Sequence, residues 1–356
     1  MGTVAVYSAT SYLAYTKLDG NTEFFLIQHL IRVGLAFGVM MLFSVINYRW
    51  VARMSKIGLI VALGLLLMVQ ILGVATNGAT RWLDLGFIGF QPSDLARVAL
   101  VLYVGVLLTR KQEYIKSFGR AFVPVFFWVF GTVLFIGLED LSTAAVLLMA
   151  TTLMCFIGRV SILQLGGMGF IGVCLAGLML LSSPGRAERV EAYLGMKIFS
   201  HTNEQTVFDD QAEGYQAKQA KIAFAMGGLV GVGPGKSGQR DFLPEPYNDF
   251  IFAIIAEEFG LIGAMAVLGL LGVLLFRGFM RIARRAPDPL GLFLAVGFTT
   301  IVVTNGLIHA AVSCGLMPVT GLALPFVSYG GTSMVTNGMM IGILLNISRQ
   351  LGGKEK

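Results

Sequence analysis

Apolar runs of about 20 residues recur along the whole of this sequence and are separated by short polar segments. A run of that length crosses the hydrocarbon core of a bilayer as one helix, whose backbone hydrogen bonds are satisfied within the segment. Of the 356 residues, 56% are hydrophobic and only 13% are charged, whereas an average soluble domain is about a quarter charged. The sequence therefore predicts an all-α polytopic membrane protein.

Ten segments have the length and hydropathy of a membrane span, although the first is slightly short. We predict spans at 1–16, 24–46, 57–75, 92–109, 121–138, 142–157, 161–182, 249–276, 289–312 and 326–348. No charged region precedes the first apolar run, so we expect no cleavable signal peptide. We expect one integral membrane domain over 1–356, with about ten transmembrane helices.

Lysine and arginine residues cluster in alternate loops, and this asymmetry gives the orientation. The short loops on one side contain only Lys17 and Arg81. The other basic loops lie on the opposite side, at 47–56, 110–120, 158–160, 277–288 and 349–356. Because basic loops remain in the cytoplasm, we expect both termini there and the long hydrophilic segment 183–248 outside. These loops explain the net charge of +6, so we expect no nucleic-acid partner.

The long outer segment 183–248 contains one stretch with a helical pattern. Ile222, Met226 and Leu229 recur at helical spacing within 215–232. A semi-apolar helix beside a membrane lies in the interface or re-enters the bilayer. Loops of this length in compact proteins are usually functional, so we expect this segment to contribute to a site.

Some ionisable residues fall well inside predicted spans, where a charge is costly and marks a functional or a paired position; they include Arg32, Arg97, Glu257 and Glu258. Arg32 lies roughly 12 Å and Arg97 roughly 8 Å below the outer ends of their spans. Glu257 and Glu258 lie roughly 12–14 Å below the outer end of theirs. The four charges fit either a polar cavity that opens outward, in which they pair, or a purely structural clamp of arginine and glutamate between helices.

Asp249 stands where the long outer segment enters the eighth predicted span. Two roles fit this position. An aspartate at a helix start caps the orphan amides of the first turn. A partly desolvated carboxylate near other acids, here Glu245 and Glu257, suits proton abstraction as a general base.

The glycine-rich run 231–237 is superficially similar to a nucleotide P-loop. It has three residues rather than four between its first glycine and the Gly-Lys-Ser sequence, and it lies away from cytosolic nucleotides. Its amides, together with Lys236 and Arg240, are instead a candidate site for a phosphate or pyrophosphate.

Prolines and small residues are concentrated in 316–333, between the last two predicted spans. We expect a loop that dips into the membrane edge and a closely packed helix start, which small residues at helix contacts would explain. Ser328 is the candidate in this stretch for lining a substrate site.

Seven segments together match one protein family in order over nearly the whole chain. They are 5–9, 81–82, 91–97, 218–223, 243–253, 257–258 and 318–331. On these segments the sequence resembles the SEDS family, the shape, elongation, division and sporulation proteins. Within the family, the glycine-rich run through Ser237 and Gln239 is more similar to the division subtype than to the elongation subtype.

The resemblance implies a ten-span fold and a peptidoglycan glycosyltransferase. Such an enzyme polymerises lipid II, with undecaprenyl pyrophosphate leaving, at the outer face of the bacterial inner membrane during cell division. It also implies a class B penicillin-binding protein as transpeptidase partner, and other division proteins. Some positions depart from the family pattern. They are Tyr247 and Asn248 in place of His-Thr, Arg97 in place of Lys, His309 in place of Asn, and Pro234 and Lys236 in the glycine-rich run.

The resemblance also assigns roles to residues. Asp249 matches the family's essential aspartate, so we expect it to be the base that deprotonates the GlcNAc 4-hydroxyl as this attacks MurNAc C1. One displacement converts an α-linked donor into a β-1,4 link, so the configuration at C1 is inverted. The leaving pyrophosphate needs positive charge, for which the candidates are Arg81, Arg97, Lys236 and Arg240. We add Glu245 and Ser328 as substrate-binding residues, and Arg32, Glu257 and Glu258 as pairing or supporting residues.

No resident cofactor is predicted. The three cysteines and three histidines lie apart in sequence and form no disulfide framework or metal-ligand motif. A divalent cation, Mg²⁺ or Mn²⁺, is an additional candidate for compensating the pyrophosphate charge.

Three alternatives remain open at this point. A flippase for the same lipid would need a polar path to both faces, yet the inner halves of the spans carry almost no ionisable residues. A non-catalytic division scaffold would leave Asp249 as a helix cap. An elongation-type polymerase would catalyse the same reaction in a different process.

Overall fold

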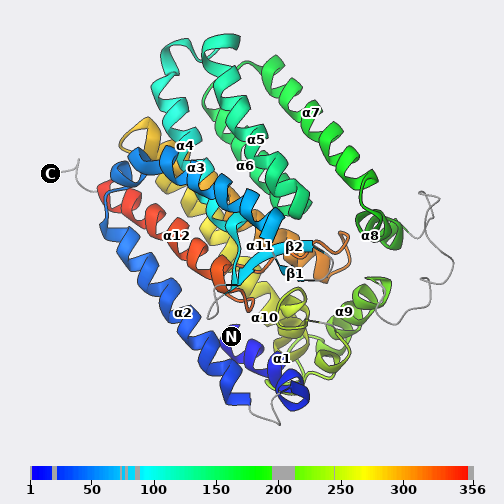
Figure 1. Cartoon of the computed structure of the whole chain (residues 1–356). Helices are drawn as coiled ribbons and strands as arrows, with labels where there is room; N and C mark the ends of the chain where they lie inside the picture. Colours follow the sequence, from blue (N-terminus) through cyan, green and yellow to red (C-terminus); the bar gives the residue numbers. More distant parts are fainter. Residues whose placement is uncertain are drawn as a thin grey trace. The chain divides into compact units, whose positions relative to one another are not determined.

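The computed structural model describes residues 2–17, 22–72, 74–76, 79–84, 89–194, 213–243 and 245–351. Helices dominate this part of the chain (Figure 1). The α-helices are α1 (Gly2–Lys17), α2 (Thr22–Val45), α3 (Tyr48–Leu72), α4 (Pro92–Arg110), α5 (Val123–Glu139), α6 (Leu141–Ile157), α7 (Ile162–Leu181), α8 (Pro184–Leu194), α9 (Glu213–Gly227), α10 (Ile251–Phe276), α11 (Pro289–Ser313) and α12 (Gly331–Leu351). The remaining elements are the strands β1 (Val74–Thr76), β2 (Ala79–Asp84) and β3 (Gly89–Phe90), and the short helices η1 (Gln112–Tyr114), η2 (Phe118–Phe122), η4 (Gln239–Asp241) and η5 (Arg277–Ala283).

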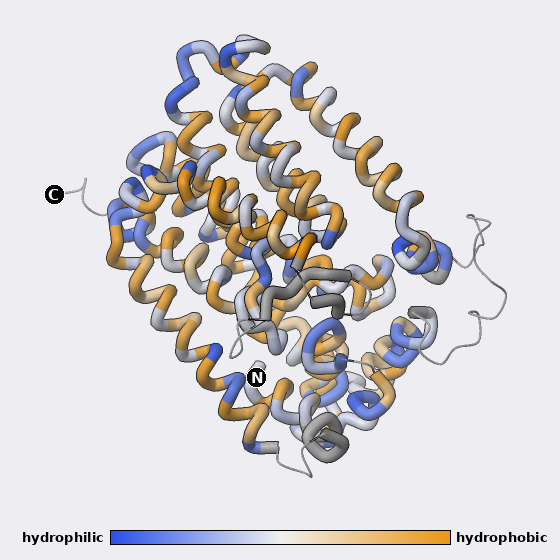
Figure 2. Tube along the Cα trace, in the orientation of Figure 1, coloured by the Kyte–Doolittle hydropathy of each residue, from blue (hydrophilic) through white to orange (hydrophobic). Residues whose placement is uncertain are grey.

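Each of the ten predicted spans overlaps one of the long helices. Seven helical segments among the described residues are long and apolar enough to cross a membrane. Hydrophobic residues follow the helices, while hydrophilic residues concentrate at helix ends and connections (Figure 2). Many large apolar side chains are exposed, such as Ile71 at 81% and Leu163 at 86%, as expected of surfaces that face lipid. The predicted class, an all-α polytopic membrane protein, is confirmed, and the count of ten spans stays a prediction.

Two helix starts differ from the predicted ones by more than three residues. Helix α3 begins at Tyr48, so the predicted basic loop 47–56 is mostly helical. Lysine and arginine reach the aqueous phase from a helix end, and for this reason their presence does not mark where a helix stops. Helix α12 begins at Gly331 rather than at 326, after a turn around Ser328.

A small antiparallel sheet, which the sequence reasoning missed, follows α3. Its strand order is β1-β2-β3, with Val74 opposite Trp82 and Leu83 opposite Phe90. Arg81 lies on β2, and the structure describes the backbone but not the side chain there.

The chain divides into two compact units. One unit comprises Met1–Gly34, Leu180–Gly272 and Thr304–Gly330. Its core gathers small residues of α1 and α9 around the first turns of α10. The other unit comprises Leu35–Met179, Val273–Val303 and Gly331–Lys356. In it α3 packs on α4, α4 on α5, and α5 on α6.

Asp288 organises the start of α11 within the second unit. Its Oδ1 accepts hydrogen bonds from the Gly291 amide at 2.7 Å and the Tyr48 hydroxyl at 2.9 Å, and its Oδ2 pairs with Arg49 Nε at 2.7 Å. Asp288 thus caps the helix one residue before Pro289, which suits the first helical position. Burial acts to raise the pKa of Asp288, but the hydrogen bonds from Gly291, Arg49 and Tyr48 outweigh it and lower the pKa.

We expect Asp288→Ala to destabilise the protein by about 0.5–2 kcal/mol, the usual contribution of a lost cap. Because the folded pKa of Asp288 is lowered, its carboxylate stabilises the protein above the unfolded pKa of about 3.9, and the contribution is lost as the pH falls through the folded pKa. Asp288→Asn keeps a capping oxygen and should lose less stability, with no such acid-dependent component. Melting temperatures in detergent across this acid range test both expectations. Equal melting of wild type and Asp288→Ala at neutral pH would contradict them.

Candidate active site

Helix α10 is interrupted at Gly260, roughly 13 Å along its axis from Ile251. Gly260 has φ 67° and ψ −168°, a backbone conformation that is essentially restricted to glycine. Interrupting a helix leaves carbonyls and amides without intrahelical partners, which is costly at membrane depth. The break therefore needs hydrogen-bond partners from another part of the chain.

The segment after α9 provides these partners. We call residues 228–241 the glycine loop. Its Val232 and Gly233 amides donate to the carbonyls of Glu257 (2.9 Å) and Glu258 (3.1 Å). In return, the amides of Leu261 and Ile262 donate to the carbonyls of Gly228 (2.9 Å) and Leu229 (3.3 Å). Both ends of the interruption are thus satisfied. The helix predicted within 215–232 is confirmed up to Gly227 as α9, but the prediction is wrong for Leu229, which lies beyond the helix end in the glycine loop.

Glu257 anchors the glycine loop through its side chain. Its carboxylate accepts hydrogen bonds from the Ser237 hydroxyl and from the amides of Gly238 (3.0 Å) and Gln239 (3.3 Å). The side chain is only 2% exposed. A buried carboxylate that accepts several hydrogen bonds holds its donors in a defined arrangement. Glu257 thereby fixes the segment that contains Lys236 and Arg240.

Glu258 ties the same loop to α1. Its carboxylate accepts a hydrogen bond from the Ser8 hydroxyl. Arg240 Nη1 donates to the Ser8 hydroxyl at 3.0 Å and to the Gly235 carbonyl at 3.0 Å. Ser8 therefore connects a buried acid with a cation, and α1, the glycine loop and α10 form one polar cluster.

The expected pairing of Arg32 with the two glutamates is wrong. Within the described part of the chain, Glu257 and Glu258 bind the glycine loop and α1, while Arg32 lies over the ring of Tyr329 at 4.1 Å and contacts Gln28. The physical reason is that loop residues and hydroxyls within spans supply hydrogen bonds at lower desolvation cost than a second buried charge.

Arg97 belongs to a buried cluster in the second unit. Its Nη2 lies 3.0 Å from Asp94 Oδ1 and donates to the Thr336 hydroxyl at 3.2 Å. Thr332 donates to Asp94 Oδ2 at 2.9 Å. The Arg97 side chain, which keeps an unpartnered Nε within the described residues, is thus held between α4 and α12.

Asp249 lies half-buried in the turn that precedes α10. The first turn of α10 closes on the carbonyl of Phe250, which accepts from the Ala253 and Ile254 amides, so Phe250 occupies the cap position. The two residues before Asp249 are fixed through their carbonyls. The Tyr329 amide donates to the Tyr247 carbonyl at 3.0 Å, and the Ser328 hydroxyl donates to the Asn248 carbonyl at 2.8 Å.

Acidic and phenolic groups surround this turn. The Glu245 carbonyl accepts from the Asn248 amide at 3.0 Å and from the Asp249 amide at 3.2 Å, and Glu245 itself adopts a left-handed φ of 53°. Burial, followed by the charges of Glu245 and Asp249, raises the pKa of Tyr247 to about 12. The Tyr247 phenol therefore remains a neutral hydrogen-bond donor beside the two carboxylates.

The predicted site residues fall into two groups. Within the first unit the structure brings together two clusters, one around Asp249 and one around the glycine loop. The members are Arg32, Lys236, Arg240, Glu245, Asp249, Glu257, Glu258 and Ser328. Lys236 is exposed and Ser328 is buried. Arg81 and Arg97 belong to the second unit.

Sequence reasoning missed Tyr329, Gln28 and the supporting role of Ser8. Gln28 and Ser8 are polar residues inside apolar helices, and this placement is the signal that could have revealed them. Tyr329 carries no comparable signal, because an aromatic residue near a helix start is common.

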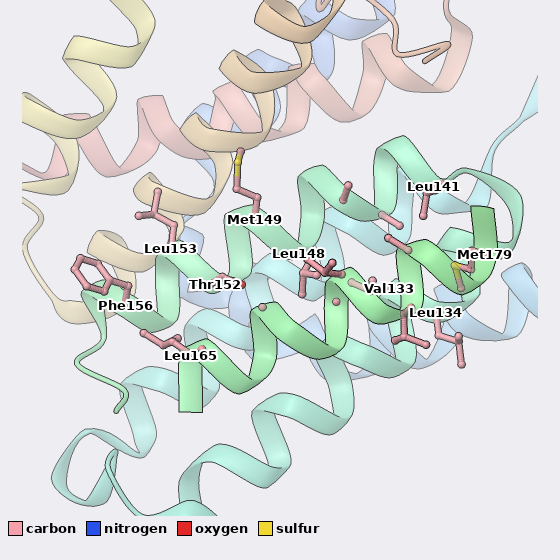
Figure 3. A pocket seen from close by; sticks show the side chains of 18 of the residues that line it. Val133, Leu134, Leu141, Leu148, Met149, Thr152, Leu153, Phe156, Leu165 and Met179 are labelled. Atoms are coloured by element: carbon pink, nitrogen blue, oxygen red, sulfur yellow. The ribbon is translucent and has the colours of Figure 1, made fainter. Parts of the chain in front are cut away.

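An apolar groove of about 750 Å³ lies in the second unit between α5, α6 and α7 (Figure 3). Its walls include Val133 of α5, Leu148 and Phe156 of α6, and Leu165 and Met179 of α7. The lining side chains are hydrophobic apart from Thr152. This chemistry suits a hydrocarbon chain rather than a polar ligand.

Among the described residues, no group of three or more His, Cys, Asp and Glu side chains gathers in a way that could hold a metal ion. Asp249 and Glu245 lie in one turn and could contribute oxygen ligands to a divalent cation.

Almost the whole chain matches one protein family. A family model described as "Cell cycle protein", FTSW_RODA_SPOVE, matches residues 1–352. The chain belongs to the FtsW/RodA/SpoVE family. The resemblance to the SEDS proteins predicted above is therefore confirmed, and a multi-pass membrane protein is what the family and the apolar helices both indicate.

Two relatives in this family cover almost the full chain. Stage V sporulation protein E of Bacillus subtilis is 38% identical over 355 residues, which is 98% of this chain and 93% of that protein. A probable peptidoglycan glycosyltransferase FtsW of Geobacter sulfurreducens is 36% identical over 358 residues, which is 99% of this chain and 92% of that protein.

Solved structures with a similar fold match almost the whole chain. One chain, reported as "Structural coordination of polymerization and crosslinking by a peptidoglycan synthase complex", matches with a TM-score of 0.74 and 25% identity over 98% of this chain and 96% of that one. The rod shape determining protein RodA of Thermus thermophilus matches with a TM-score of 0.66 and 24% identity, over 98% and 95%.

Proposed function

We propose that this chain is a peptidoglycan glycosyltransferase, which polymerises lipid II at the outer face of the bacterial cytoplasmic membrane during cell division. The observation that carries the proposal is the 36% identity, over 99% of the chain, to a protein named as a probable peptidoglycan glycosyltransferase FtsW. The arrangement around Asp249 supports it, because a half-buried carboxylate is held in a fixed turn beside a neutral phenol.

In the proposed reaction, Asp249 accepts the proton of the GlcNAc 4-hydroxyl of one lipid-linked molecule. The hydroxyl oxygen bonds to MurNAc C1 of another, and the bond from C1 to the pyrophosphate oxygen breaks. The electron pair leaves with undecaprenyl pyrophosphate. A single displacement inverts the configuration at C1, from α to β. We propose that Tyr247 and Glu245, which lie in the same turn as Asp249, form hydrogen bonds with sugar hydroxyls.

Positive charge compensates the leaving pyrophosphate in this proposal. Lys236, exposed on the glycine loop, is more accessible than Arg97 or Arg240. Arg240 already binds Ser8 and Gly235, so we propose that it mainly orders the loop and contributes its charge. Arg81 and Arg97 remain candidates from the second unit, and Ser328 acts through the Asn248 carbonyl.

We further propose that hydrocarbon tails of the substrate lie between helices, as in the apolar groove of α5, α6 and α7. The partner would be a class B penicillin-binding protein, which is consistent with the structural match to a peptidoglycan synthase complex. Other division proteins would be further partners. Both termini would be cytoplasmic, as the basic loops indicate, and 183–248 would lie outside within a single domain.

The test is polymerisation of labelled lipid II by the purified chain together with its class B partner. Penicillin would be present to block transpeptidation, and the products would be separated by gel electrophoresis. A ladder of glycan strands is the expected result. Labelled lipid II that remains monomeric despite an intact complex would overturn the proposal.

A flippase is the second candidate, since a membrane protein that handles the same lipid could move it instead of polymerising it. Vesicles that contain the chain and fluorescent lipid II distinguish the two. Movement of lipid II across the bilayer without any polymer would favour the flippase. The identity to a sporulation protein makes sporulation a second setting for the same polymerase.

A further inference from the structure

Arg32 of α2 lies on the face of the Tyr329 ring. Its guanidinium carbon is 4.1 Å from the ring centroid. A cation over an aromatic face is attracted by the ring quadrupole, and the contact strengthens when both groups are partly desolvated. Arg32 is half-buried, and it lies within the membrane-spanning part of α2. The contact is therefore a built feature of the first unit rather than a chance surface encounter.

One turn of α2 holds Tyr329 from several directions. The Tyr329 hydroxyl donates to Gln28 Oε1 at 2.7 Å, and Arg32 Nη2 donates to the same oxygen at 3.4 Å. The imidazole ring of His29, which is fully buried, stacks on the Tyr329 ring with centroids 5.9 Å apart and planes 19° apart. Gln28, His29 and Arg32 thus determine both the position and the tilt of the Tyr329 ring.

Tyr329 transmits this position to the turn that carries Asp249. Its ring meets the ring of Tyr247 edge-on, with centroids 5.8 Å apart. Its amide donates to the Tyr247 carbonyl at 3.0 Å. The neighbouring Ser328 hydroxyl donates to the Asn248 carbonyl. The two peptide groups immediately before Asp249 are therefore held by Ser328 and Tyr329.

We propose that Arg32 is a positioning residue for the reaction at Asp249 and that it acts through Tyr329. This inference rests on the proposed function. A catalytic base has to be held close to its productive geometry, and a displacement of about 1 Å caused by a distant substitution can reduce the rate roughly 100-fold. Without Arg32, one face of the Tyr329 ring is uncovered and the turn before Asp249 gains freedom.

A direct role for Arg32 in binding pyrophosphate is the competing explanation, since the charge would suit an anion. The geometry favours positioning, because the guanidinium already covers an aromatic ring and shares Gln28 with the Tyr329 hydroxyl. The two explanations differ in kinetics. Loss of a substrate-binding group raises KM, whereas loss of positioning lowers kcat.

We expect Arg32→Ala to lower kcat for lipid II polymerisation by about 10- to 100-fold and to change KM by less than about 2-fold. Arg32→Lys should recover most of the rate, because an ammonium group over the ring keeps the attraction. Tyr329→Phe keeps the stacked ring and should lose only a few-fold. Arg53→Ala is the matched control, since Arg53 lies over the Trp50 ring at 5.0 Å in the second unit and should leave the rate unchanged.

Coupling between Arg32 and Tyr329 tests the route of action. If Arg32 acts through Tyr329, the double variant Arg32→Ala with Tyr329→Leu should be no slower than Tyr329→Leu alone. Melting temperatures identify any variant that fails to fold. A rise in KM at unchanged kcat, additive losses in the double variant, or wild-type kinetics of a folded Arg32→Ala would each overturn the inference. Absence of polymer from the wild type would instead overturn the proposed function.

Discussion

An Asp249→Asn variant is expected to fold normally and to polymerise lipid II roughly 100- to 10,000-fold more slowly than the wild type, the usual contribution of a general base. Asparagine has the shape of aspartate but cannot accept the proton of the attacking hydroxyl. The turn should survive, because the backbone amide of residue 249, which donates to the Glu245 carbonyl at 3.2 Å, is unchanged in the variant. Initial rates of glycan formation measure the effect, and lipid II binding should remain close to wild type.

The matched control for this substitution is Glu188→Gln. It makes the same change from carboxylate to amide on α8, where Glu188 is exposed and lies in the same predicted outer segment. We expect its rate to equal that of the wild type. Polymerisation by Asp249→Asn at the wild-type rate would reduce Asp249 to a residue of the turn and would favour another base.

The positions of the long helices could be predicted because each must provide a long apolar run to cross the bilayer. Ile251–Phe276 and Pro289–Ser313 match the predicted segments within two residues. The predicted start of a helix was wrong where basic residues lie within the helix but reach water with their side chains. Arg49 and Arg53 lie inside α3, since a long cationic side chain can reach water from the helix end.

The candidate site was predicted only in part. Charges within spans drew attention to Glu257 and Glu258, and the family resemblance drew attention to Asp249. Their partners could not be predicted, because sequence spacing does not tell how deep a loop reaches along a distant helix. Gly260 illustrates the difficulty. A single glycine in an apolar helical run is usually tolerated as a slightly weaker helix position, yet here it breaks the helix and receives a loop.

The partner of Arg32 could not be predicted for the same reason. Its depth in the span correctly marked it as a residue with a partner, and an acid was the natural expectation. The partner is the aromatic ring of Tyr329, which lies almost 300 residues away in the sequence. Gln28, in the same part of α2, contacts Tyr329 across a sequence separation of 301. Such a contact depends on tertiary packing, for which local patterns hold no information.

Gly260→Ala is expected to destabilise the protein strongly. The φ and ψ of Gly260 already cost any other residue about 1–3 kcal/mol. A Cβ there would in addition overlap the Leu229 carbonyl, and it would separate the loop from the helix break. The four hydrogen bonds across the break would then be left unsatisfied at membrane depth. We expect a total loss of roughly 3 kcal/mol or more, seen as little folded protein in detergent extracts.

Gly269→Ala is the control in the same helix, because a Cβ at Gly269 meets nothing within 4 Å. It should be neutral or slightly stabilising, since alanine has the higher helix propensity by about 1 kcal/mol.

A second pair separates backbone strain from contact. Gly231 and Gly235 have φ of 90° and 77°, but only a Cβ at Gly231 would overlap the Glu258 carbonyl. Gly231→Ala should therefore lower the melting temperature much more than Gly235→Ala. Equal effects of the two substitutions would mean that backbone strain alone requires these glycines, and not the docking of the glycine loop on the broken helix.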